Sequence, residues 1–136
     1  MQDRQQQRLV APVVTHAAMC ETECWDDPVR GKVQWWTLLS ADRTPSHGMT
    51  CGVAELAPGQ AETLHPHQHA QPEVYHFLGG TGVVHIGALE HSVGAGSTVF
   101  IPGDVSHGVR NTGDTPLRLF YVFAVDSFAD VQYVFP

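Results

Sequence analysis

The sequence predicts an all-β fold, an antiparallel β-sandwich or β-barrel in a single domain. Short apolar runs alternate with turn-forming residues at intervals of about 8–12 residues, which is typical of such folds. Glycine and proline are frequent, with 13 and 9 of the 136 residues, whereas only 15% of the residues are charged. The intervals between apolar runs leave no room for crossover helices, so a parallel sheet is not expected.

The predicted strands follow one another from residue 33 onward, and turn signals separate them. Apolar or alternating segments cover residues 33–39, 49–56, 73–78, 83–86, 98–101, 108–110 and 117–125, with a short run near residue 93. Turns such as Pro58-Gly59 and Pro102-Gly103-Asp104 end the strands before them. Residues 30–136 are therefore expected to form the β-domain. Residues 1–29 are less regular and are expected to form an arm on this domain or on a second subunit, with residues 10–14 as a candidate extra strand.

Charge and cysteine content exclude several classes of function. The 14 acidic and 7 basic residues give a formal net charge of −7, which argues against nucleic acid and anionic membranes as partners. The three cysteines contain no C-x-x-C pair and do not form a disulfide framework. No segment resembles a signal peptide or a membrane span, so a soluble cytoplasmic protein is expected. The nine histidines outnumber lysine and arginine together, and this favours a metal site.

Most of the chemistry-bearing residues lie in one short segment. His65, His67 and His69 are spaced two residues apart, and Glu73 follows four residues after the last of them. Residues two apart on a strand share a face, so these side chains are expected to converge, although Pro66 makes a continuous strand doubtful. Four potential ligands on one side of so short a stretch indicate a metal site.

Two motifs in the chain resemble the paired motifs of the cupin superfamily. The first is Gly59, His67-x-His69, Glu73 and Gly79, and the second is Gly96, Pro102-Gly103, His107 and Asn111. The resemblance covers about residues 33–125 and implies a cupin-type antiparallel β-barrel, also called a double-stranded β-helix or jelly roll. It also implies a metal ion held where the two motifs meet. Cupins host many reactions, so the fold alone does not assign one.

The first motif fits the cupin pattern in two registers. Gly59 has the expected spacing to His65 and His67, whereas Glu73 has the expected spacing to His67 and His69. Because ligands must converge while the loop before them can vary in length, the second register is preferred. The expected metal ligands are His67, His69, Glu73 and His107, and His65 is placed at the pocket mouth as a substrate-binding residue. This donor set suits one divalent transition-metal ion, iron or manganese by preference, with nickel, cobalt and zinc as alternatives.

Tyr75 lies two residues beyond Glu73 and is expected to face the same cavity. It is either a core aromatic residue or a general base whose pKa a nearby cation lowers. The spacing of the four expected ligands and Tyr75 resembles that of the small cupin dimethylsulfoniopropionate lyases. This resemblance implies that the metal holds the substrate carboxylate and that Tyr75 removes the adjacent proton, which releases dimethyl sulfide and acrylate.

Aromatic side chains would hold the sulfonium group of such a substrate through cation–π contacts, with Tyr121 and Tyr133 as candidates. Two other functions stay open: an Fe(II)-dependent dioxygenase or isomerase with the same ligands, and a non-enzymatic small-molecule-binding or sensor cupin. Tyr75 is the residue that separates the lyase from both. The expected partner is a small carboxylate-bearing substrate, and the resemblance to small cupins implies a homodimer.

Overall fold

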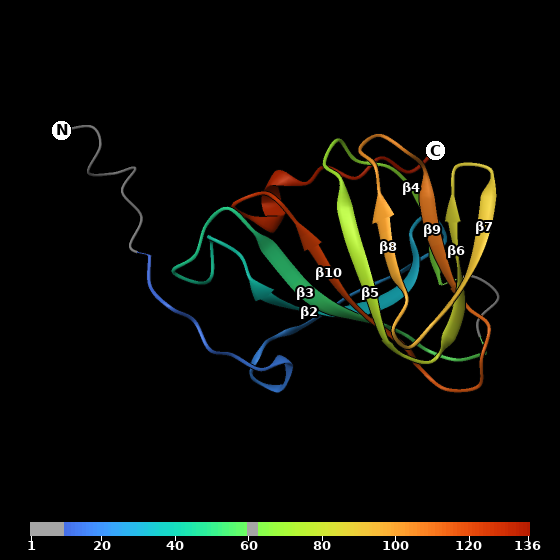
Figure 1. Cartoon of the computed structure of the whole chain (residues 1–136), viewed down its shortest axis with the longest axis horizontal. Helices are drawn as coiled ribbons and strands as arrows, with labels where there is room; N and C mark the ends of the chain where they lie inside the picture. The colour runs from blue at the N-terminus through green and yellow to red at the C-terminus, as the bar shows by residue number, and fades with distance from the viewer. Residues whose placement is uncertain (1–9, 60–62) are drawn as a thin grey trace.

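The computed structural model of the chain describes residues 10–59 and 63–136 (Figure 1). Its described part contains one antiparallel sheet of ten strands in the order β7-β6-β9-β4-β2-β3-β10-β5-β8, with β1 paired to β2 beside this path. The strands are β1 (Thr22–Asp27), β2 (Gly31–Leu39), β3 (Thr50–Leu56), β4 (Leu64–His67), β5 (Glu73–Gly79), β6 (Thr81–Ile86), β7 (Leu89–Gly94), β8 (Thr98–Ile101), β9 (His107–Asn111) and β10 (Leu117–Phe123). Two short 3₁₀ helices, η1 (Ala17–Met19) and η2 (Phe128–Asp130), lie near the ends of the chain.

In Figure 1 the strands β3, β10, β5 and β8 appear beside the strands β9, β6 and β7, although the sheet connects the two groups through β2 and β4. The sheet therefore curls on itself. This arrangement confirms the predicted antiparallel β-barrel class. The segments predicted from apolar runs correspond to β2, β3 and β5 to β10. None of the helices in the described residues has the length and hydropathy that a bilayer-spanning segment requires.

Two strands lie where no strand was assigned from the sequence. β1 belongs to the predicted arm and pairs with β2 from Thr22↔Trp36 to Asp27↔Gly31, so this part of the arm packs on the barrel. Residues 10–14 form no strand, and residues 1–9 of the arm lie outside the described residues. β4 contains Pro66 and is irregular, with a register shift between its first and last residues. A proline cannot donate a ladder hydrogen bond, which explains why this strand is short and bulged.

Alternation along the strands separates the core from the surface. In β10, Leu117, Leu119, Tyr121 and Phe123 are buried, while the residues between them are half-buried. In β5 the inward positions are Glu73, Tyr75 and Phe77 in that order. The first two inward positions of β5, Glu73 and Tyr75, therefore carry ionisable side chains, and the third, Phe77, is purely apolar. This order places the candidate site at one end of the barrel interior.

Candidate metal centre and substrate cavity

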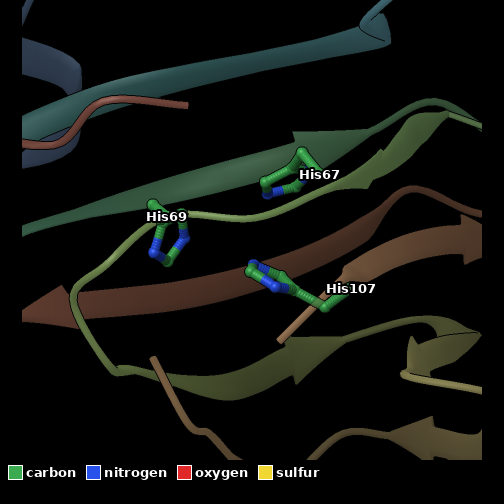
Figure 2. A group of neighbouring side chains, drawn as sticks. All are labelled: His67, His69 and His107. Atoms are coloured by element: carbon green, nitrogen blue, oxygen red, sulfur yellow. The ribbon is translucent and has the colours of Figure 1, made fainter. Parts of the chain in front are cut away.

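Three histidines converge inside the barrel from separate places in the chain (Figure 2). His67 is the last residue of β4, His69 lies in the loop that follows, and His107 is the first residue of β9. His67 and His107 are direct partners across the β4–β9 pair. One ring nitrogen from each of the three lies within 4.8 Å of the others, and all three residues are buried. The fold therefore brings together the three histidines of the predicted ligand set.

Backbone carbonyls fix the orientation of each imidazole. The Nδ1 atoms of His67, His69 and His107 donate to the carbonyl oxygens of His65, Gln71 and Val105, each at 2.8 Å. With Nδ1 protonated, each Nε2 carries a lone pair. All three Nε2 atoms are buried and have no hydrogen-bond partner among the described residues. A carbonyl bond at one ring nitrogen and a free lone pair at the other is the usual arrangement of a histidine metal ligand.

The carboxylate of Glu73 lies against this group. Its Oε1 atom is 3.2 Å from Nε2 of His69 and 3.5 Å from Nε2 of His107, and it makes no hydrogen bond within the described part of the chain. An acceptor oxygen that faces nitrogen lone pairs is unfavourable unless a proton or a cation lies between them. One divalent transition-metal ion would satisfy these four orphaned atoms together. The residues present therefore fit a metal centre.

The histidines differ in how readily they take up a proton. Burial lowers the pKa of His67 to about 4, so this imidazole is neutral near pH 7. Burial also acts to lower the pKa of His69, but the adjacent negative carboxylate of Glu73, 3.2 Å away, outweighs that effect and raises the pKa. A proton therefore competes with a metal ion at His69, and acid should weaken metal binding.

His65 lies apart from the three converging rings. Its backbone carbonyl accepts from His67, and its ring packs beside Gly31, where a Cβ atom would lie 2.8 Å from the His65 ring. It does not line the cavity next to the metal centre. The contribution of His65 that the structure shows is therefore to orient His67 through the main chain, while its predicted role at the pocket mouth stays a prediction.

An apolar cavity of about 50 Å³, which is room for about three or four waters, adjoins the metal centre. All three tyrosines that the sequence singled out line it. Among the described residues, no lysine or arginine lines this cavity. Its walls consist of Trp25, Val33, Trp35, Ala54, Leu56, Leu64, His67, Glu73, Tyr75, Leu119, Tyr121, Phe128 and Tyr133. A small ligand with an apolar or cationic end fits such walls better than a dianion does.

Sequence reasoning missed part of this aromatic lining. Trp25 is an inward residue of β1, in a segment assigned to the arm, and Phe128 lies in η2. The sequence carries no apolar alternation that indicates Trp25, because the half-buried positions on either side of it are the acidic residues Glu23 and Asp27. For Phe128 no pattern exists either, because a single 3₁₀ turn has no periodicity to read.

Tyr75 occupies the wall between the metal centre and the core. Its side chain is 3% exposed, its ring centroid is 6.3 Å from that of His107, and its cross-strand partner is Tyr121. Burial, with the charge of Glu73, raises the pKa of the Tyr75 phenol well above its ordinary value. A cation nearby acts in the opposite direction.

Strand β1 and the C-terminal segment meet beside the candidate metal centre. Val134 exchanges two backbone hydrogen bonds with Gln68, the residue between the first two histidines of the site. The rings of Tyr133 and Phe135 each lie 5.2 Å from the ring of His67. Trp25 contacts both of them edge-on, at 5.1 and 5.7 Å. Aromatic side chains from β1 and from the C-terminal segment therefore cover the site together.

Comparison with known proteins agrees with this geometry. Dimethylsulfoniopropionate lyase DddW from Ruegeria pomeroyi is 40% identical over 109 residues, which are 80% of this chain and 70% of that protein. The oxalate-binding protein of Thermotoga maritima is 31% identical over 93 residues, 68% of this chain and 76% of that protein. The crystal structure of a predicted oxalate decarboxylase from Thermotoga maritima is 26% identical, with a TM-score of 0.71 over 83% of this chain and 99% of that one.

The family match covers the part of the chain that holds the site. Residues 52–123 match the family described as Cupin domain, and this range contains the three histidines, Glu73 and Tyr75. Together with the curled antiparallel sheet and the two motifs that meet inside it, the match shows that the chain belongs to the cupin family.

Proposed function

We propose that this protein is a metal-dependent carbon–sulfur lyase that cleaves dimethylsulfoniopropionate into dimethyl sulfide and acrylate. The observation that carries the proposal is the placement of Tyr75, whose phenol shares a cavity wall with Glu73 beside the three histidines. The relationship to dimethylsulfoniopropionate lyase DddW, at 40% identity over 80% of this chain, supports the same reaction.

His67, His69, His107 and Glu73 would hold one divalent transition-metal ion, with iron or manganese favoured and nickel, cobalt or zinc as alternatives. When bound, the ion would supply the positive charge that attracts the substrate carboxylate, acidifies the neighbouring C–H group and favours the phenolate form of Tyr75. The backbone carbonyls that hold the three Nδ1 atoms keep the rings in place before the metal arrives.

In this proposal Tyr75 acts as the base of a β-elimination. It takes the proton from the carbon next to the carboxylate, and the electrons of that C–H bond form the C=C bond of acrylate. The C–S bond breaks, and sulfur leaves with the electron pair as neutral dimethyl sulfide. Because the sulfonium is already cationic, the leaving group needs no acid. A positioned base of this kind contributes about 10²–10⁴-fold to the rate.

The aromatic walls suit the sulfonium end of the substrate. Trp25, Trp35, Tyr121, Phe128 and Tyr133 surround the cavity with π faces and edges. Each favourable cation–π contact is worth about 0.5–2 kcal/mol. The carboxylate end would then point toward the metal centre, and this orientation places the carbon between the two ends near Tyr75.

A small-anion-binding protein is the second candidate function. The oxalate-binding protein of Thermotoga maritima is 31% identical over 68% of this chain, and this relationship favours a metal-held anion without a reaction. Oxalate carries two negative charges, however, and none of the described residues that line the cavity is a lysine or arginine. The apolar aromatic walls therefore favour a ligand with one carboxylate and one cationic end.

Headspace gas chromatography of the metal-loaded protein with dimethylsulfoniopropionate tests the proposal. Dimethyl sulfide release by the wild type is expected, and Tyr75→Phe should keep its metal and its substrate affinity but lose at least about 100-fold in rate. His76→Gln is the matched control, because His76 bonds to Thr98 on the other face of β5. Absence of dimethyl sulfide, together with tight binding of oxalate in calorimetry, would favour the second candidate.

A further inference from the structure

A row of inward-facing positions crosses four neighbouring strands at the level of Tyr75. Tyr75 of β5 pairs with Tyr121 of β10, Tyr121 pairs with Gly52 of β3, and Gly52 pairs with Thr37 of β2. The three side chains in this row are 3–5% exposed. Directly paired residues on neighbouring strands share a face. Three hydroxyl-bearing side chains therefore lie in line inside the barrel, and a glycine separates the second from the third.

Gly52 makes the space that the Tyr121 hydroxyl occupies. A Cβ atom at this position would overlap the Tyr121 oxygen and would lie 2.6 Å from the carbonyl oxygen of Trp36. A glycine in a strand interior often marks such a close approach. The phenol of Tyr121 therefore extends across β3 toward Thr37, while its ring lines the cavity.

Thr37 connects this row to the surface. Its Oγ1 donates to Oε2 of Glu23 at 2.9 Å, and Arg43 donates to both oxygens of the same carboxylate at 2.7 and 3.1 Å. The Glu23 side chain is 20% exposed, so the row ends at solvent. Because the Thr37 hydroxyl donates its hydrogen bond to Glu23, the lone pairs of its oxygen can accept a hydrogen bond from a donor on the cavity side.

The Tyr121 hydroxyl is the candidate for that donor. It is buried and has no hydrogen-bond partner among the described residues. Gly52 is paired with Tyr121 on one side and with Thr37 on the other, and this register brings the two hydroxyl-bearing side chains to the same part of the barrel interior. Burial raises the pKa of Tyr121 well above its ordinary value, and the Thr37 hydroxyl offsets part of that rise. A small movement of the Tyr121 phenol toward Thr37 would complete a continuous line from the cavity to Glu23.

We propose that Tyr121, Thr37 and Glu23 form a path that carries a proton from the substrate cavity to solvent. The inference rests on the proposed function, because the elimination releases one proton per turnover into a cavity with apolar walls. The Tyr121 oxygen accepts the proton that Tyr75 has taken from the substrate, as its own proton passes to Thr37, and Tyr75 returns to its phenolate form. The Thr37 proton passes to Glu23, which releases it to water. Both hydroxyls then rotate back, and every group on the path returns to its starting charge.

A purely structural role would have a different signature. The bond between Thr37 and Glu23 also ties β1 to β2, so its loss could simply loosen the sheet. A looser sheet would slow the first turnover and every later turnover alike. A blocked proton path leaves the first turnover intact and slows only the later ones, because the proton of the first reaction stays in the cavity.

Rapid-mixing measurement of acrylate formation by the metal-loaded protein, over the first and later turnovers, distinguishes these cases. Thr37→Val should give a burst of about one acrylate per site at the wild-type rate and then a steady state slower by about tenfold or more. Thr37→Ser restores the hydroxyl and should abolish the burst. Glu23→Gln keeps a hydrogen-bonding surface residue without a base and should show the burst as well.

Thr50→Val is the matched control, because Thr50 is buried on β3 and its hydroxyl donates to a backbone carbonyl off the row. It should show no burst. Equal first and later rates in both Thr37→Val and Glu23→Gln would overturn the proton path and leave the lyase function standing. A wild type that forms no acrylate would overturn the lyase function, and with it the proton that the path is proposed to carry.

Discussion

The metal-free protein should lose stability as the pH falls from 7 to 5, because His67 is buried in its neutral form. The pKa of this imidazole is lowered from 6.5 to about 4 in the folded chain. The unfolded chain therefore takes up a proton at a higher pH than the folded chain does. The contribution of His67 is complete above about pH 6.5 and is lost as the pH falls toward 4. The whole shift is worth about 3 kcal/mol, of which about 2 kcal/mol falls between pH 7 and pH 5.

Two other groups of side chains contribute to the pH dependence of the free energy of unfolding. The raised pKa of His69 acts in the opposite direction, since its contribution is present at low pH and is lost as the pH rises through the folded pKa. The carboxylates of Glu23 and Asp42 have lowered pKa values, so their contributions are lost mainly below pH 5. A comparison with a variant that lacks only the His67 imidazole therefore isolates its effect.

Urea unfolding of the chelator-treated protein at pH 7, 6 and 5 makes that comparison. Between pH 7 and 5 the wild type should lose about 2 kcal/mol more of its free energy of unfolding than His67→Asn does. His91→Asn is the control, because His91 is exposed on β7 and should leave the slope unchanged. Identical slopes for the wild type and His67→Asn would refute the argument that burial keeps this imidazole neutral.

Metal content distinguishes the two registers in which the first motif fits the cupin pattern. Plasma mass spectrometry should show that His69→Ala loses the bound metal and that His65→Ala keeps it. The reverse result would contradict the proposed ligand set. Gly52→Ala should lower the free energy of unfolding by about 1–3 kcal/mol because its Cβ would crowd a backbone carbonyl at 2.6 Å. Gly94→Ala, with no atom nearer than 3.6 Å, should change it by less than about 0.5 kcal/mol in the same urea titration. Light scattering should give twice the chain mass of 14.8 kDa, and Phe100→Glu, on the 64% exposed side chain of the edge strand β8, should give the monomer. A monomeric wild type would contradict the expected homodimer.

Turn chemistry made most of the fold predictable from the sequence. Glycine and proline signals such as Pro58-Gly59 end strands whose apolar residues alternate, and both features depend only on neighbours in the chain. β1 was not predictable in the same way, because Glu23 and Asp27 occupy inward positions that a buried strand would give to apolar residues. Glu23 is tolerated there because Arg43 and Thr37 bond to it, and those partners are remote in sequence.

Residue spacing alone does not determine which of His65, His67 and His69 are metal ligands. Parity alone places His65, His67 and His69 on one face, since it assumes an unbroken strand. Pro66 breaks that strand, and the register shift in β4 sets His67 opposite His107 while the His65 ring turns toward Gly31. The bulge also brings the His65 carbonyl onto Nδ1 of His67, so the displaced residue fixes the tautomer of its neighbour. The proline that makes the strand hard to recognise is thus part of what orients a candidate ligand.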